Sequence, residues 1–118
     1  MYSSTSSDLV KLIYNDENPN GNTSFNHAHS KGVIVMGKSV GFWLVHSVPK
    51  YPSLLAAKRY GYPHTGQMYG QSFLCISLAT SASAESIGRL LQTNWPFIND
   101  MSLPKWAEKR YDIDYNVA

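Results

Sequence analysis

Runs of apolar residues predict four β-strands in this chain. One covers residues 8–14, two more cover residues 28–36 and 40–46, and a fourth covers residues 71–78. The second and third runs are separated by the short turn Gly37-Lys38-Ser39, so we expect them to form a β-hairpin. Because these two runs are nearly continuous in apolar residues, they indicate central strands covered on both faces. The run at residues 71–78 is likewise expected to be buried.

The segments between these runs predict loops and helices. Residues 15–22 are a dense cluster of turn formers and indicate an exposed loop, and the prolines of residues 47–52 favour another. Short helical turns are expected at residues 54–60 and 105–110. Ser83 is a candidate cap for a helix that ends at residues 94–96. Its apolar face is expected to consist of Ile87, Leu90, Leu91 and Trp95.

Strands that alternate with helices place the chain in the α/β class, as one layered domain. The length of 118 residues fits a single domain. Hydrophobic residues make up 43% of the chain and charged residues 15%, which excludes a chain disordered throughout. No apolar run reaches the roughly twenty residues of a transmembrane helix. Residues 1–5 have neither the basic nor the apolar region of a signal peptide, so the sequence by itself predicts a cytosolic protein.

The net charge is +2 with neutral histidines, and protonation of the four histidines would raise it to about +6. The chain would then attract polyanions more strongly in an acidic compartment. This balance alone does not identify a protein that binds nucleic acid.

His29 and Lys31 are the candidate chemical residues. They lie two positions apart at the start of a strand, so their side chains leave the same face. The ammonium group offers a fixed positive charge to phosphate oxygens, and the imidazole offers a nucleophile or proton carrier. His46 ends the partner strand of the hairpin and could return to the same edge. The alternative is that the pair is only a solvated strand end.

Other polar residues carry weaker hypotheses. His27, His29 and His46 do not have the spacing of a zinc site, and no cysteine or carboxylate is expected beside them. His64 is expected to be exposed in a loop. Asn22 begins an Asn-x-Ser glycosylation sequon. Cys75 is either a buried free thiol or a cysteine whose disulfide partner is absent.

Several segments together resemble the deoxyribonuclease II family, whose members are acid nucleases of the phospholipase D-like superfamily. The segments lie in the family's order and with similar spacing between residues 9 and 78. They are LIYNDENP (12–19), HSKGV (29–33), GFWLVHSVP (41–49), YPH (62–64) and YGQSFLC (69–75).

The resemblance implies a fold and a mechanism. The fold would be half of a layered α-β-α phospholipase D-like domain with a mixed sheet. Two His-x-Lys motifs would build one site, in which one histidine attacks the phosphorus of DNA and the other protonates the leaving 5′ oxygen. The lysines would stabilise the phosphoryl oxygens, no metal or other cofactor would be needed, and the products would carry 3′-phosphates. His29 and Lys31 match the first motif, and His46 matches a supporting position.

The chain also departs from the family pattern. Residues 32–39 hold no acidic residue, although the superfamily often has one after the lysine. Family members are about three times longer, carry a signal peptide, act in lysosomes or after secretion, and pair the cysteine corresponding to Cys75 with another. The second His-x-Lys motif, the signal peptide and that cysteine are all missing here. We therefore expect residues 1–118 to be an N-terminal-half fragment that is inactive by itself.

A second half or a homodimer would complete the site, as in superfamily members with one motif. The alternative function is a catalytically inactive relative that is secreted or binds DNA as an interaction protein. A plain cytosolic α/β domain with a buried thiol is the remaining reading, and the long family-like segments disfavour it.

Overall fold

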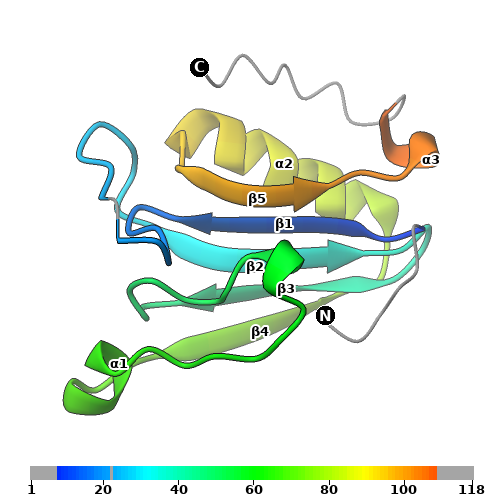
Figure 1. Cartoon of the computed structure of the whole chain (residues 1–118). Helices are drawn as coiled ribbons and strands as arrows, with labels where there is room; N and C mark the ends of the chain where they lie inside the picture. The colour runs from blue at the N-terminus through cyan, green and yellow to red at the C-terminus, as the bar shows by residue number, and fades with distance from the viewer. Residues whose placement is uncertain (1–7, 22, 109–118) are drawn as a thin grey trace.

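The protein is described by a computed structural model for residues 8–21 and 23–108. Five strands form one sheet in the order β4-β3-β2-β1-β5 (Figure 1). Each neighbouring pair is antiparallel. The α/β class is confirmed, whereas the predicted mixed sheet is wrong for the described strands. These strands are β1 (Val10–Asn15), β2 (Lys31–Met36), β3 (Gly41–His46), β4 (Phe73–Leu78) and β5 (Ile98–Ser102).

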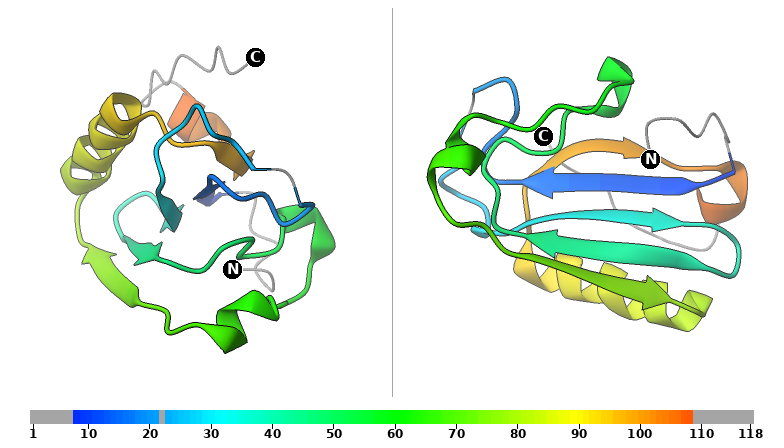
Figure 2. Two further views of the ribbon diagram at one scale, coloured as in Figure 1. Left: turned by 90° about the vertical axis from the view of Figure 1, so that its left-hand side faces the viewer. Right: turned by 90° about the horizontal axis from the view of Figure 1, so that it is seen from below.

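Helical segments lie on both sides of the sheet. The long helix α2 (Ser81–Asn94) covers one face of the sheet, and the short segments η1 (Leu55–Ala57) and α1 (Thr65–Met68) lie on the opposite side (Figure 2). A further short helix, α3 (Lys105–Glu108), follows β5. The helical turns expected at residues 54–60 and 105–108 are confirmed, while Lys109 and Arg110 lie outside the described residues. Of the helices described, none combines the length and apolar character needed to cross a membrane.

Strand β2 is buried on both faces, as its apolar sequence predicts, whereas β3, for which the same was expected, is only half-buried apart from His46. Every residue of β1 and β2 is buried. One apolar cluster packs β1 and β2 against Leu78 and against Ile87 and Leu91 of α2. The opposite face holds a second cluster around Ile13, Val33 and Val35. The predicted hairpin of β2 and β3 is also confirmed, because the N–H of Gly37 donates to the carbonyl of Val40 at 2.9 Å and closes its turn.

Strand β4 corrects the prediction of a buried strand at residues 71–78. It lies at the edge of the sheet, and all its residues except Leu78 are exposed. Leu74 keeps 60% of its surface accessible. Cys75 is exposed as well, so the interpretation of a buried thiol is wrong. An apolar run predicts a strand, but whether other elements cover that strand depends on its position in the sheet.

Helix α2 begins earlier than predicted. Its cap is Thr80, whose side chain accepts a hydrogen bond from the N–H of Ser83 at 3.2 Å, so Ser83 lies inside the first turn. The helix ends at Asn94, as expected. Of its predicted apolar face, Ile87 and Leu91 are buried, but Leu90 and Trp95 are 45% and 60% exposed. Those two side chains therefore do not belong to the core.

Candidate active site

His29 and Lys31 lie at one end of the sheet, where β2 begins. Lys31 is the first residue of β2 and pairs with Asn15 at the end of β1. The strand pairing buries the Lys31 side chain, which is only 3% exposed, whereas the side chain of His29 is 83% exposed. A buried ammonium group therefore lies beside an imidazole that solvent or a substrate can reach.

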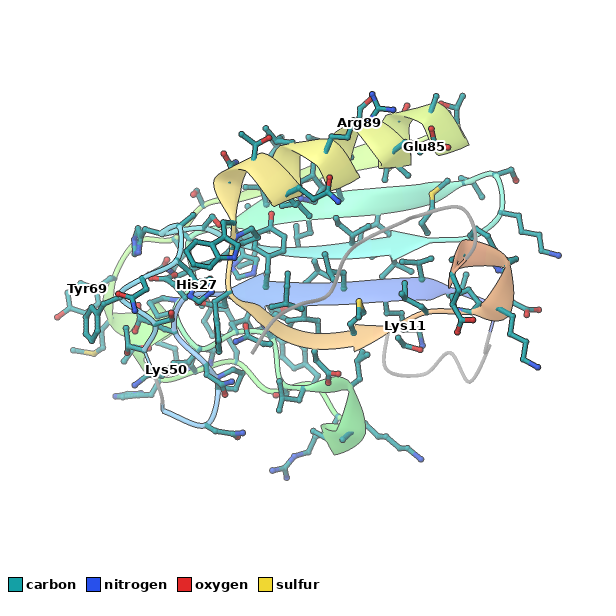
Figure 3. The ribbon with its side chains drawn as sticks, turned by 90° about the horizontal axis from the view of Figure 1, so that it is seen from above. Lys11, His27, Lys50, Tyr69, Glu85 and Arg89 are labelled. Atoms are coloured by element: carbon teal, nitrogen blue, oxygen red, sulfur yellow. The ribbon has the colours of Figure 1, made fainter. Side chains whose placement is uncertain are left out.

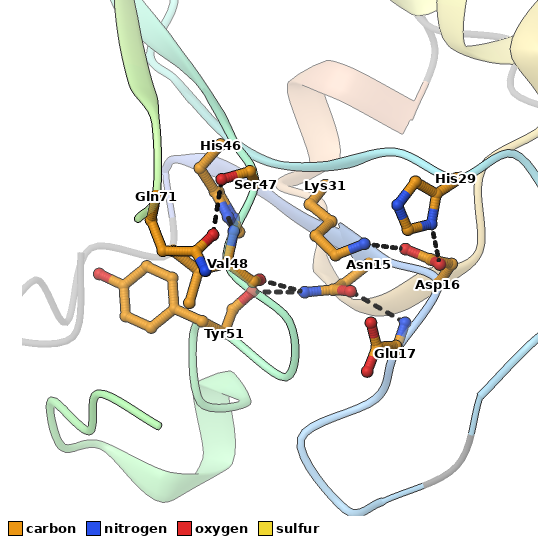
Figure 4. A network of polar contacts seen from close by, with 10 residues as sticks. All are labelled: Asn15, Asp16, Glu17, His29, Lys31, His46, Ser47, Val48, Tyr51 and Gln71. Atoms are coloured by element: carbon orange, nitrogen blue, oxygen red, sulfur yellow. Dashed lines mark hydrogen bonds and ion pairs between the residues drawn. The ribbon is translucent and has the colours of Figure 1, made fainter. Parts of the chain in front are cut away.

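A third residue, Asp16, joins the two. Its Oδ2 atom lies 2.6 Å from Nδ1 of His29, and its Oδ1 atom accepts a short hydrogen bond from Nζ of Lys31 (Figure 4). The Asp16 side chain is only 7% exposed. The expectation that no carboxylate lies near these histidines is thus wrong, as is the expectation that residues 15 and 16 belong to an exposed loop. The acidic residue directly follows the neighbouring strand β1 and does not come from the segment after Lys31.

Asn15 fixes the backbone on which Asp16 stands. Its fully buried side chain donates to the carbonyls of Val48 at 3.1 Å and Tyr51 at 2.9 Å, and accepts from the N–H of Glu17 at 2.9 Å. The carbonyl of Asp16 accepts from the N–H of Ser24 at 2.7 Å. These bonds attach the end of β1 to the loop after β3, so the carboxylate has little freedom to move.

The electrostatics keep Asp16 ionised. Burial by itself would raise the pKa of Asp16, but hydrogen bonds and positive charge from Lys31 and His29 outweigh burial and lower this pKa below its usual value. An ionised carboxylate only accepts hydrogen bonds, so Nδ1 of His29 must carry the proton that it donates. In the neutral imidazole the free lone pair is then on Nε2, which is the nitrogen suited to attack.

His46 reaches the same end of the sheet but is buried. Its Nδ1 atom accepts a hydrogen bond from the N–H of Val48 at 3.2 Å, which places the proton of the neutral ring on Nε2. The ring contacts Tyr51 edge-on and stacks with Phe73. Burial, and secondarily the charge of Lys31, lower the pKa of His46 to about 4. His46 is therefore neutral under mildly acidic conditions.

An open cavity of about 370 Å³ lies between this end of the sheet and α2. His29, Lys31 and His46 all line it, so the predicted convergence of these three residues occurs. Tyr14 and Asn94 contribute to the wall from β1 and α2. The volume falls within the range of about 300–1,000 Å³ that is usual for ligand pockets.

The other histidines and the cysteine singled out in the sequence are not among the described residues that line this cavity. His27 pairs with Ser24 through Nδ1 at 2.5 Å, and His64 is exposed, as expected. Across residues 8–21 and 23–108, no three His, Cys, Asp or Glu side chains gather in a way that could hold a metal ion. Cys75 is the only cysteine of the sequence. Asn22, the predicted glycosylation position, lies outside the described residues.

The sequence contained a signal for Asp16 that its loop-like surroundings concealed. Asp16 lies two residues after the first predicted strand (residues 8–14), and His29 and Lys31 lie at the start of the second (residues 28–36). Antiparallel pairing of these two strands brings the end of one to the start of the other. Pairing them before assigning the loop would have placed the carboxylate beside the His-Lys pair.

Comparisons with known proteins match this chain to deoxyribonucleases. The family model Deoxyribonuclease II matches residues 1–115. Deoxyribonuclease-2-alpha of Rattus norvegicus is 37% identical over 118 residues, which cover 97% of this chain and 33% of that protein. Plancitoxin-1 of Acanthaster planci is 42% identical over 98 residues, which cover 81% of this chain and 27% of that protein. Deoxyribonuclease-2-beta of Rattus norvegicus is 43% identical over 98 residues, which cover 82% of this chain and 27% of that protein. The chain thus spans about a third of the length of these relatives or less.

Proposed function

The chain belongs to the deoxyribonuclease II family, and from that premise we propose that it supplies one half of an active site that hydrolyses DNA phosphodiesters. The observation that carries the proposal is the Asp16 carboxylate, which binds both His29 and Lys31 and so holds the two groups side by side. An imidazole whose Nε2 faces away from the carboxylate, next to a cation, suits attack on a phosphodiester.

In the proposed first step, the lone pair on Nε2 of His29 attacks the phosphorus atom. The N–P bond forms as the bond from phosphorus to the 5′ oxygen breaks, and an acid protonates that oxygen as it leaves. Lys31 stabilises the negative charge on the non-bridging oxygens. Asp16 stabilises the positive charge that develops on the imidazole, through its hydrogen bond to Nδ1. Water then hydrolyses the phosphohistidine and leaves a 3′-phosphate, without any metal.

The acid in this step is not His46. Its pKa of about 4 leaves it neutral where an acid nuclease works, and its Nδ1 atom already accepts a hydrogen bond from the backbone of Val48. We assign His46 a supporting role in the wall of the cavity. A second His-x-Lys motif supplies the proton, either from further sequence or from a second copy of this chain.

An acid optimum follows from this assignment, because the proton donor must be charged and the unperturbed pKa of histidine is about 6.5. The described sheet and α2 would then form half of a phospholipase D-like layered domain. The family relationship supports a protein that works on DNA in lysosomes or after secretion.

A chimera tests the proposal. The chain replaces the matching segment of rat deoxyribonuclease-2-alpha, with which it aligns over 118 residues. We expect the chimera to nick supercoiled plasmid at about pH 5 in the presence of a chelator. When the reaction is stopped with base, the phosphohistidine intermediate should remain on the protein and be detectable. His29→Ala should abolish both signals. His64→Ala removes an exposed loop histidine and should change neither.

Equal activity of the His29→Ala and His64→Ala chimeras would refute the assignment of His29. The 118-residue chain alone should bind DNA. It should cut DNA only if sedimentation shows that it forms a dimer. Cleavage by a monomer would refute the half-site, and DNA binding by an inactive chimera would favour the alternative of a non-catalytic DNA-binding relative.

A further inference from the structure

Trp95 has an unusual backbone conformation beside the candidate active site. It caps the C-terminal end of α2 with φ 50° and ψ 59°, in the left-handed region. Glycine and asparagine are preferred at such helix ends, because a bulky side chain there crowds its own backbone. Tryptophan is therefore a costly choice at this position.

Core packing does not explain this choice, because 60% of the Trp95 surface is exposed. The neighbouring cap bond, from the N–H of Trp95 to the carbonyl of Leu91 at 2.8 Å, uses only the backbone and any residue could make it. Strained residues cluster at functional sites, where the strained position presents a side chain that is needed there. The exposed indole ring is thus a candidate for ligand contact.

The surroundings place Trp95 next to the residues of the site. The carbonyl of Trp95 accepts a hydrogen bond from the N–H of Ala28 at 3.3 Å, one residue before His29. The indole ring packs at a tilt against the imidazole of His27, with 4.6 Å between centroids. His27 lies at the end of the sheet where α2 ends (Figure 3). Asn94, the preceding residue, lines the cavity together with His29 and Lys31.

The charge distribution indicates which part of a nucleotide this ring would meet. The C-terminal end of a helix carries partial negative charge, so the end of α2 disfavours a phosphate. The buried ammonium group of Lys31 provides the cation for a phosphate at the start of β2 instead. A neutral, flat group suits the indole, and aromatic rings in proteins that bind single strands stack on nucleobases of any sequence.

We infer that Trp95, supported by His27, is a stacking platform for a nucleobase next to the phosphate held at His29 and Lys31. The inference rests on the proposed function, since it takes DNA as the substrate. Stacking on this ring would fix the register of the strand in the cavity and would favour a frayed or unpaired nucleotide, whose base is free to stack.

The test compares two fluorescently labelled probes that differ only in their bases. One is an octamer of thymidylate, and the other is an octamer of abasic sites with the same phosphates. Binding to the 118-residue chain is followed by fluorescence anisotropy. Trp95→Ala should weaken binding of the thymidylate probe by about tenfold, since each stacked base typically contributes that much or more, and leave the abasic probe unchanged. Trp95→Phe should restore most of the loss.

Val40→Ala is the matched control, because Val40 is 66% exposed in the β2–β3 turn at the opposite end of the sheet. Equal loss for both probes in Trp95→Ala, or no loss for either, would overturn the stacking inference. Failure of the proposed function would give a different result. In that case the Lys31→Met variant would bind the abasic probe as tightly as the wild-type chain does.

Discussion

Nδ1 of His29 lies 2.6 Å from Oδ2 of Asp16, and this contact determines which nitrogen of the neutral imidazole carries the free lone pair. The carboxylate comes from the residue after β1, while the histidine precedes β2. The arrangement supplies the acidic partner that residues 32–39 lack. A charged orienting group can therefore come from just beyond the end of a neighbouring strand, and a search limited to residues after the motif misses it.

The first prediction concerns Asp16 as a positioning residue. Asp16→Asn keeps the size of the side chain but removes the charge that orients and stabilises the His29 ring. In the chimera we expect kcat for plasmid cleavage to fall by about 100-fold or more, because correctly placed acid-base groups typically contribute 10²- to 10⁴-fold. DNA affinity should change little, which separates positioning of His29 from loss of binding.

Glu17→Gln is the control for Asp16→Asn. It neutralises the adjacent carboxylate. Glu17 contacts this network through its backbone N–H, which donates to Asn15. Its kcat should stay near the wild-type value. A comparable fall in both variants, or a large loss of DNA affinity in Asp16→Asn, would contradict the positioning role.

A second prediction follows from the burial of Lys31. Its side chain is 3% exposed and that of Asp16 is 7% exposed, so each charge depends on the other. Asp16→Ala should lower the free energy of unfolding by about 3–5 kcal/mol, because it leaves a buried ammonium group without its counter-charge. The double variant Asp16→Ala/Lys31→Met should regain a large part of that loss in urea denaturation. A double variant less stable than Asp16→Ala alone would contradict this account.

The third prediction concerns stability as a function of pH. The pKa of His46 falls from 6.5 to about 4 on folding, so between these values the unfolded chain binds a proton that the folded chain does not. Stability should therefore fall as the pH drops from about 6.5 to 4. The lowered pKa of Asp16 adds a further loss below its usual value of 3.8.

His46→Asn isolates the first of these effects. Asparagine does not titrate, and its side-chain oxygen can replace Nδ1 as the acceptor for the N–H of Val48. Urea midpoints of this variant should be nearly constant from about pH 6.5 to 4 and should still fall in stronger acid. A slope as steep as that of the wild type would show that another group titrates.

Much of the fold was predictable from apolar patterning, and the failures have physical causes. The buried strands β1 and β2 and the hairpin of β2 and β3 were recognisable from their runs of apolar residues. Strand β5, with the sequence INDMS, was missed because it is polar and joins the edge of the sheet through its backbone. Its Asp100 accepts a hydrogen bond from the N–H of Leu55 at 2.7 Å, a contact that no local pattern predicts.

The site was predictable only in part. The spacing of His29 and Lys31 identified the pair, and the hairpin brought His46 to the same cavity. Asp16 was missed because it lies in a segment whose composition favours an exposed loop. Composition does not reveal that the Asn15 side chain is hydrogen-bonded to the carbonyls of Val48 and Tyr51, which attaches this segment to the fold. Trp95 was read as part of a buried helix face, since periodicity does not reveal a left-handed helix end.

The last prediction uses two glycines that respond oppositely to the same substitution. A Cβ atom at Gly32 would overlap the phenol ring of Tyr14 and lie 2.7 Å from the carbonyl of Leu44, so Gly32→Ala should destabilise the fold by about 1–3 kcal/mol. It should also disturb the 3.0 Å hydrogen bond from Nε1 of Trp43 to Tyr14 and change tryptophan fluorescence.

Gly88 lies within α2 with open space around its Cα atom, so Gly88→Ala should stabilise the protein by about 1 kcal/mol through helix propensity. Urea midpoints of the two variants should therefore move in opposite directions from the wild type. Only Gly32→Ala should alter the fluorescence spectrum, because Tyr14, which the new Cβ atom would displace, accepts the hydrogen bond from the indole of Trp43. An upward shift of both midpoints would mean that Tyr14 can move aside, and that the close approach of β1 and β2 at Gly32 does not constrain the cavity.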